Sequence, residues 1–186
     1  MCPAPIEFPV EGLTDGVVRL RLLAEHDVAA IVAAVQDPEI PRYTRVPNPY
    51  GEQEARQWQR MATTGLSAGT DLPTLIVDPV DARLLGAVGL HNIDPESGRC
   101  SAGYWVAAAE RGRGVAQRAL RLLCEYAVRE LRVHRVELWI EPENVASLRV
   151  AEAAGFTREG LLRSFMSIAG ERRDMLMYSL LPTELG

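Results

Sequence analysis

The sequence predicts a mixed α+β fold, with about seven strands and about four helices in a single domain spanning residues 1–186. Three observations predict it. The chain has 186 residues, close to the size of one typical domain. It is 47% hydrophobic and 24% charged, the balance of an ordinary globular protein. The spacing of its apolar residues changes between a period of two and a helical period, without an internal repeat or a linker.

The first half of the chain is expected to supply one strand and two helices. Apolar residues alternate with Arg over 17–22, which is the pattern of a half-exposed strand. Helical spacing follows over 24–36. A second, more polar helix is expected over 52–62, before Gly65 and Gly69 break it.

The segment between these helices, residues 38–50, contains four Pro and is expected to be a stiff loop rather than a helix. We expect it to form a wall that faces the substrate, with Tyr43 and Tyr50 available for stacking and hydroxyl contacts. The alternative is a rigid connector that only joins two helices.

The second half alternates strands with helices. Turn-rich segments separate three strands that we expect to form an antiparallel meander, over 74–77, 83–92 and 99–106. A long helix from Val115 and a strand over 135–140 then make a crossover unit whose two strands should be parallel. The last expected elements are a helix over 144–154 and a hairpin of 156–164 with 173–181.

Charge and composition exclude several classes of function. All 20 basic residues are Arg, so a P-loop lysine and Schiff-base chemistry are excluded. The net charge of -5 argues against nucleic acid as a partner. No apolar stretch approaches the length of a membrane span, and the first twenty residues do not resemble a signal peptide. We therefore expect a cytoplasmic protein with no membrane partner.

Cysteine and histidine do not indicate a metal site. The three Cys (Cys2, Cys100 and Cys124) and the three His (His26, His91 and His134) are widely spaced and form no ligand motif. We predict no metal, and we interpret Cys100 and Cys124 as packing residues. A lone histidine is more often packed or turn-capping than catalytic, and His91 is interpreted in that way.

The glycine-rich turn at residues 110–116 is the most informative segment, because it joins a predicted strand to the longest predicted helix. Free amides at a helix start, approached closely over Gly112 and Gly114, make a cradle for phosphate oxygens. Arg111 and Arg113 add positive charge. The alternative is a tight turn with solvated arginines.

A second segment, residues 141–147, follows the expected parallel strand and begins a helix. Asn144 is a good N-cap, and Ser147 lies on the same side of the first turn. Capping alone is the alternative to a catalytic serine.

These motifs together resemble the GNAT superfamily of N-acetyltransferases, and within it the RimJ/RimL-type branch that acetylates the N-termini of ribosomal proteins. The order and spacing match that branch in the following runs: Gly89-Leu90-His91-Asn92-Ile93, Gly103-Tyr104-Trp105-Val106, Arg111-Gly112-Arg113-Gly114-Val115-Ala116, Asn144-Val145-Ala146-Ser147, Gly155-Phe156 and Arg173-Asp174-Met175. The resemblance is strongest over 84–181. It implies a strongly twisted mixed sheet whose central parallel strands splay apart to admit acetyl-CoA.

The resemblance also implies roles for individual residues. The pyrophosphate of acetyl-CoA would lie on the amides of Arg111, Gly112, Arg113, Gly114, Val115 and Ala116, and the pantetheine arm along Trp105, Val106 and Ala107. Asn144 would contact the pantetheine or the acceptor, and Ser147 would stabilise or protonate the departing thiolate.

Two positions depart from the wider family. The Tyr that often serves as general acid is Ala151, and a carboxylate often found before the Gly-Tyr-Trp run is Ser101. The general base is therefore unassigned. Candidates near the expected mouth are Glu110, Glu141 and Asp94, whereas alternation along its strand gives Glu137 a structural or solvent-facing position.

The resemblance and the chemistry of the residues agree on one function, direct transfer of an acetyl group from acetyl-CoA to a primary amine on a protein N-terminus or a small molecule. One alternative is a non-catalytic acyl-CoA-binding sensor or scaffold. Another is transfer of a larger acyl group such as succinyl. The sequence is also compatible with a homodimer.

Overall fold

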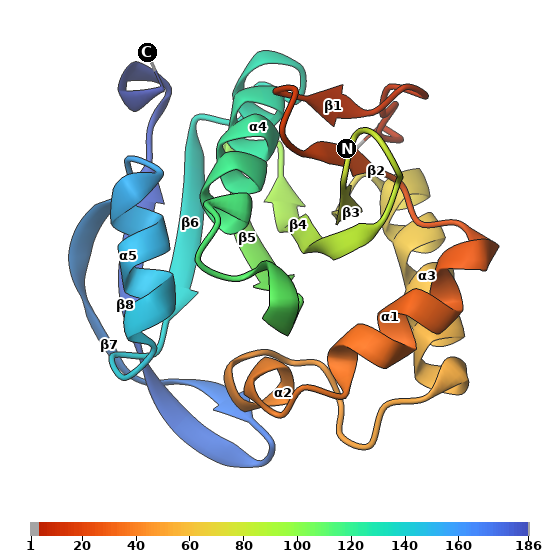
Figure 1. Ribbon diagram of the computed structural model, residues 1–186. Coiled ribbons are helices and arrows are strands. Elements are labelled where there is room, and N and C mark those ends of the chain that lie inside the picture. Colours follow the sequence, from red (N-terminus) through yellow and green to blue (C-terminus); the bar gives the residue numbers. More distant parts are fainter. Residues whose placement is uncertain (1–3, 186) are drawn as a thin grey trace.

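The computed structural model describes residues 4–185 and places them in an eight-stranded sheet with helices against both faces (Figure 1). The strands are β1 Leu13–Thr14, β2 Arg19–Arg21, β3 Leu72–Val77, β4 Leu84–Asp94, β5 Arg99–Val106, β6 Arg135–Ile140, β7 Thr157–Ile168 and β8 Glu171–Leu180. The α-helices are α1 Val28–Val35, α2 Glu39–Tyr43, α3 Glu52–Ala68, α4 Val115–Arg129 and α5 Val145–Ala153. The predicted α+β class is confirmed.

The order of strands in the sheet is β1-β2-β3-β4-β5-β6-β8-β7. The expected meander β3-β4-β5 and the closing hairpin β7-β8 are antiparallel, and β5 and β6 are parallel, as the crossover predicted. The count of about seven strands was one too low, because Leu13–Thr14 pairs with β2. Two residues are too few to show a period of two in the sequence.

The expectation that residues 38–50 contain no helix was wrong, and with it the count of about four helices. A five-residue helix, α2, occupies Glu39–Tyr43, so that the described chain has five α-helices. Pro41 is the third residue of α2. It is tolerated there because the amide groups of a first turn have no partner within the helix.

Helix α3 extends six residues beyond the predicted end at residue 62, to Ala68. Gly65 does not break it, and the helix ends where Gly69 adopts a left-handed conformation with φ of 71°. Glycine is the usual residue at such a helix end because it has no Cβ to clash. The helix continues through Gly65 because this residue is buried against the chain that follows.

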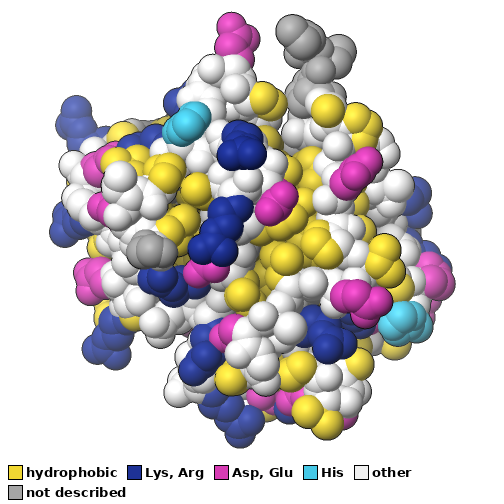
Figure 2. Space-filling view, turned by 90° about the horizontal axis from the view of Figure 1, so that it is seen from above, with side chains coloured by type: hydrophobic (Ala, Val, Ile, Leu, Met, Phe, Trp, Pro, Cys, Tyr) yellow, Lys and Arg dark blue, Asp and Glu magenta, His cyan; other side chains and the backbone are white. Residues whose placement is uncertain are grey.

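The two faces of the sheet carry separate apolar cores. Helix α4 packs on one face, and the buried Cys100 and Cys124 belong to that core, which confirms their packing role. Cys2 lies outside the described residues. Helices α1 and α3 pack on the other face over Leu75, Ala87 and Trp105. On the face shown in Figure 2, arginine side chains are interspersed with acidic ones rather than gathered in a patch.

The parallel strands β5 and β6 stay together over only three residue pairs, from Arg99↔Arg135 to Ser101↔Glu137. Beyond Ser101 they diverge, while β5 remains paired with β4 as far as Val106. The opening between β5 and β6 is the central feature of the sheet for function. No helix within residues 4–185 is long and apolar enough to cross a membrane.

Candidate active site

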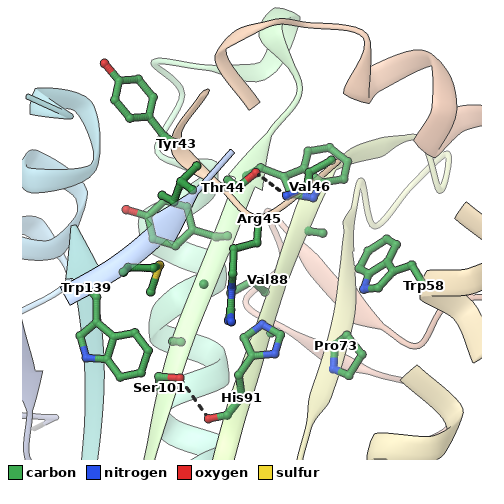
Figure 3. A pocket seen from close by; sticks show the side chains of 18 of the residues that line it. Tyr43, Thr44, Arg45, Val46, Trp58, Pro73, Val88, His91, Ser101 and Trp139 are labelled. Atoms are coloured by element: carbon green, nitrogen blue, oxygen red, sulfur yellow. Dashed lines mark hydrogen bonds between the residues drawn. The ribbon is translucent and has the colours of Figure 1, made fainter. Parts of the chain in front are cut away.

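A cavity of about 630 Å³ opens where β5 and β6 diverge (Figure 3). Its walls come from several parts of the chain: helix α1, the segment Tyr43–Tyr50, helix α3, the strands β3 to β6, the start of helix α5, and the β7-β8 hairpin. Tyr43 and Tyr50 both line it, as expected for a wall that faces the substrate. The segment is therefore more than a connector between two helices.

The glycine turn precedes α4 and has the geometry of an anion cradle. Gly112 and Gly114 have φ of 74° and 76°, a conformation that favours glycine, and no heavy atom lies within 4 Å of a Cβ built on either residue. Gly114 is the N-cap of α4 and no side chain caps this helix end. The amides of the first turn, including those of Val115 and Ala116, therefore have no partner within the helix.

The arginines of this turn are engaged in ion pairs. Arg111 Nη2 lies 2.6 Å from Asp37 Oδ2, and Arg113 Nη1 lies 3.1 Å from Glu110 Oε2. Glu110 is buried and also contacts Arg83. The two charges that the sequence assigned to phosphate are thus partly neutralised, and the backbone amides are left as the main anion donors of the turn.

The edge of β5 that faces the opening offers unpaired backbone groups. The Ala107 amide donates to the Leu85 carbonyl at 2.9 Å, so this amide is already used. In an antiparallel ladder alternate residues face the same neighbour, and therefore Val106 and Tyr104 direct their amide and carbonyl groups toward the opening. Of the three residues expected along the pantetheine arm, Val106 has an amide that faces the opening, while its carbonyl accepts from Arg111 Nε at 3.2 Å.

Asn144 and Ser147 begin helix α5 at the other side of the opening. Asn144 Oδ1 accepts a hydrogen bond from the Ser147 amide at 3.1 Å, which confirms the predicted N-cap. Both residues line the cavity. The Tyr104 hydroxyl reaches across from β5 to the Ser147 carbonyl at 3.4 Å, and burial raises the pKa of Tyr104 to about 12. Two hydroxyls, of Ser147 and Tyr104, therefore lie at this end of the cavity.

Of the three candidate carboxylates, Glu110, Glu141 and Asp94, the structure places only Glu141 in the cavity wall. Glu110 is held by arginines, Glu137 accepts bonds from Arg135 and Trp139, and Asp94 caps the β4-β5 turn. Glu141 is 7% exposed, and its Oε1 has no hydrogen-bond partner among the described residues. Burial raises the pKa of Glu141, and Arg173, with Nη1 3.4 Å from Oε2, opposes that effect.

Two polar residues of the cavity were not identified as functional from the sequence. His91 lines the cavity instead of packing in a core, and its Nδ1 lies 3.1 Å from Asp71 Oδ1. The partners are 20 residues apart in the chain, so no local motif indicates the pair. Among residues 4–185 no group of three or more His, Cys, Asp or Glu side chains could hold a metal ion.

Comparisons with known proteins agree with this geometry. The family model for the acetyltransferase (GNAT) domain matches residues 18–157. N-acetyltransferase p20 of Bacillus licheniformis is 30% identical over 89% of this chain and 93% of its own length. The [ribosomal protein uS5]-alanine N-acetyltransferase of Escherichia coli is 26% identical over 56% of this chain and 55% of its own.

Among solved structures, Mycobacterium smegmatis RimJ in complex with CoA-disulfide superimposes with a TM-score of 0.84. It is 25% identical, and the match covers 94% of this chain and 86% of that chain.

A carboxylate at the glycine turn should abolish the anion cradle. We expect Gly114→Asp to weaken CoA binding by about tenfold or more, because the new side chain occupies the space left open and repels phosphate. Calorimetric titration with CoA measures the effect. Gly170→Asp is the matched control, since Gly170 also has a positive φ and open space but lies in the β7-β8 turn. Equal CoA affinity of a folded Gly114→Asp and the wild type would show that the cradle is elsewhere.

Proposed function

The chain belongs to the GNAT acetyltransferase family and is an acetyl-CoA-dependent N-acetyltransferase, and we propose that its acceptor is the primary amine of a peptide N-terminus. The observation that carries the proposal is the charge of the cavity. Its charged lining residues are three carboxylates, of Glu54, Asp71 and Glu141, and one guanidinium, of Arg45. An acidic cavity attracts an ammonium group.

Aromatic side chains complete the environment of a cation. Tyr50, Trp58 and Trp139 line the same cavity, and ring faces attract ammonium groups. Trp139 is held edge-to-face against Phe165, with ring centroids 5.1 Å apart, so its position is fixed by β7. These features favour a primary ammonium over an anionic or neutral acceptor.

Arg45 favours a peptide over a polyamine. A polyamine carries further ammonium groups, which the guanidinium in the same cavity would repel, whereas a peptide presents one ammonium followed by carbonyl groups that Arg45 can bind. The Escherichia coli relative acts, by its name, on an alanine of ribosomal protein uS5. That name supports a protein acceptor for this chain.

In the proposed reaction the cosubstrate supplies the acetyl thioester and the chain supplies position and proton transfer. The glycine turn holds the pyrophosphate, the Val106 edge of β5 holds the pantetheine, and Ser147 donates a proton to the departing thiolate. An acyl-cysteine step is disfavoured, since Cys100 and Cys124 are buried and burial raises the pKa of Cys100 to about 12.

A panel of acceptors tests the proposed function. Short peptides with a free N-terminus, the same peptides with a blocked N-terminus, and spermidine are incubated with acetyl-CoA, and thiol release and product mass are measured. We expect acetylation of the free α-amino group only. Turnover of spermidine but of no peptide would contradict the peptide assignment. CoA binding without turnover of any amine would favour a sensor, and preference for succinyl-CoA would favour the larger acyl group.

Three expectations from the sequence stay predictions. They are the homodimer, the cytoplasmic location and the organisation of residues 1–186 as one domain.

A substitution at Ser147 distinguishes a catalytic role of its hydroxyl from a structural role at the start of helix α5. We expect Ser147→Ala to lower kcat by about 10²-fold with CoA affinity nearly unchanged, because a positioned proton donor is lost. The cap itself is formed by the Asn144 side chain and the Ser147 amide, both of which the variant retains. Thermal melting on the same preparation is the control. A loss of stability of about 1 kcal/mol with normal turnover would indicate a structural hydroxyl instead.

A substitution at Glu141 tests whether this carboxylate binds the acceptor amine. We expect Glu141→Gln to raise KM for the peptide by about tenfold or more, because a hydrogen bond to a charged group contributes about 1.5–3 kcal/mol. KM for acetyl-CoA should stay within about twofold. Steady-state kinetics with each substrate varied in turn measure both constants. Equal changes in the two constants would contradict a role confined to the acceptor.

A further inference from the structure

The pair formed by Asp71 and His91 has the arrangement of a proton acceptor. Asp71 precedes β3 and His91 lies in β4, with Nδ1 3.1 Å from Oδ1. The hydrogen bond from His91 is the largest cause that lowers the pKa of Asp71, so the carboxylate stays ionised and can only accept. Nδ1 must then carry the proton, which leaves the lone pair of a neutral ring on Nε2.

Nε2 faces the floor of the cavity. Gly89 of β4 and Gly103 of β5 are directly opposite each other in the sheet. A Cβ built on Gly89 would lie 3.3 Å from Nε2 of His91, and one built on Gly103 would lie 3.8 Å from it. The ring therefore lies over two glycines whose missing side chains leave room for it, and all three residues line the cavity (Figure 3).

An irregularity of the backbone fixes the direction of His91. The pairing of β4 with β5 shifts between His91 and Asp94, and Asn92 adopts a φ of 51°. The Ser101 hydroxyl donates to the His91 carbonyl and accepts from Asn92 Nδ2, both at 3.1 Å. Bulges of this kind redirect side chains next to active sites, and asparagine tolerates the left-handed conformation better than most residues.

Gly65 fixes the position of Asp71. A Cβ built on Gly65 would lie 2.7 Å from Asp71 Cβ, a distance at which one of the two must move. The carbonyl of Gly65 also accepts from the Thr70 amide at 3.0 Å. A glycine inside a helix is destabilising relative to alanine. Its presence in α3 is explained by the close approach of Asp71.

We propose that His91, oriented by Asp71, is the general base that accepts the proton of the acceptor ammonium at Nε2. The proposal rests on the proposed function. The neutral amine then forms its bond to the carbonyl carbon, the carbon–sulfur bond breaks, and the thiolate leaves with the electron pair. Ser147 donates a proton to the thiolate and regains one from the second proton that the nitrogen loses as the amide forms. The proton on His91 returns to solvent. Asp71 and Gly65 are positioning residues.

The other charged side chains of the cavity, Glu54, Glu141 and Arg45, have contacts of a different kind from those of Asp71 and His91. Glu54 is engaged with the Gly51 amide at 2.8 Å at the start of α3, and Glu141 faces Arg173. Arg45 extends from its loop toward the His91 ring in Figure 3. An imidazole also titrates nearer to neutral pH than a carboxylate, which suits a base that must accept and release a proton in each cycle.

The test compares His91→Gln with wild type across pH. At neutral pH we expect kcat to fall by roughly 10²–10⁴-fold, with CoA affinity and melting temperature retained. The deficit should shrink as pH rises above about 8, where the α-amino group loses its proton in solution. It should also be small for an acceptor amine of low pKa, such as aminoacetonitrile, if wild type acetylates it. An unchanged kcat, or an equal deficit at every pH, overturns the proposal.

Two further variants keep the test independent of His91 itself. Asp71→Asn should show the same pH-dependent deficit in weaker form, and Gly65→Ala should show it because Asp71 is displaced. Gly160→Ala is the control, since a Cβ there meets nothing within 4 Å. Normal pH profiles in folded Asp71→Asn and Gly65→Ala overturn the positioning role. If wild type acetylates peptides while the His91 variant is normal, only the base assignment fails. If wild type acetylates no peptide, the acceptor assignment fails, and the comparison is made with whichever amine is turned over.

Discussion

The divergence of β5 from β6 after Ser101 is the constraint on which the rest of the structure depends. It leaves the amides of Tyr104 and Val106 without a strand partner, and it opens the cavity between the two halves of the sheet. Each strand is held on its outer side, β5 by β4 and β6 by β8, so the opening costs few hydrogen bonds. The Tyr104 side chain reaches across the opening, and its hydroxyl donates to the Ser147 carbonyl of helix α5 at 3.4 Å.

Ion pairs, rather than anion recognition, occupy the arginines that flank this opening. Arg111 connects the end of β5 to Asp37 of the α1-α2 junction, and its Nε also donates to the Val106 carbonyl at 3.2 Å. Arg135 bridges Glu137 and Glu159 where β5 and β6 are still paired. A planar guanidinium can donate hydrogen bonds to two acceptors at once, which allows one arginine to connect two elements of the structure. The proposed phosphate cradle would therefore depend mainly on the backbone amides of the glycine turn.

Elements with a strong local signal were predicted well, and the misses have tertiary causes. The bounds 99–106 and 135–140 agree with β5 and β6, and clear turn residues mark the start of the first, after Gly98, and the end of the second, before Pro142. Gly65 was interpreted as a helix break, but the packing of Asp71 against it explains the glycine within α3. The glycine turn and the Asn144 cap are local and were found. The Asp71–His91 pair depends on β3 and β4 lying side by side, and one sequence does not show that register.

The cosubstrate side and the acceptor side of the cavity are built from different material. The cosubstrate side is made of glycine conformations, a strand edge and a helix start, which come from residues 103–147. The acceptor side is made of side chains, and Tyr43, Tyr50, Trp58 and Asp71 come from the first half of the chain. A site made of backbone groups keeps its shape when neighbouring side chains are substituted, whereas a wall made of side chains changes its shape and chemistry with each substitution. Relatives can therefore share one cosubstrate site and differ in the amine they accept, and the acceptor of this chain must be argued from its own side chains, those of the first half together with Trp139 and Glu141.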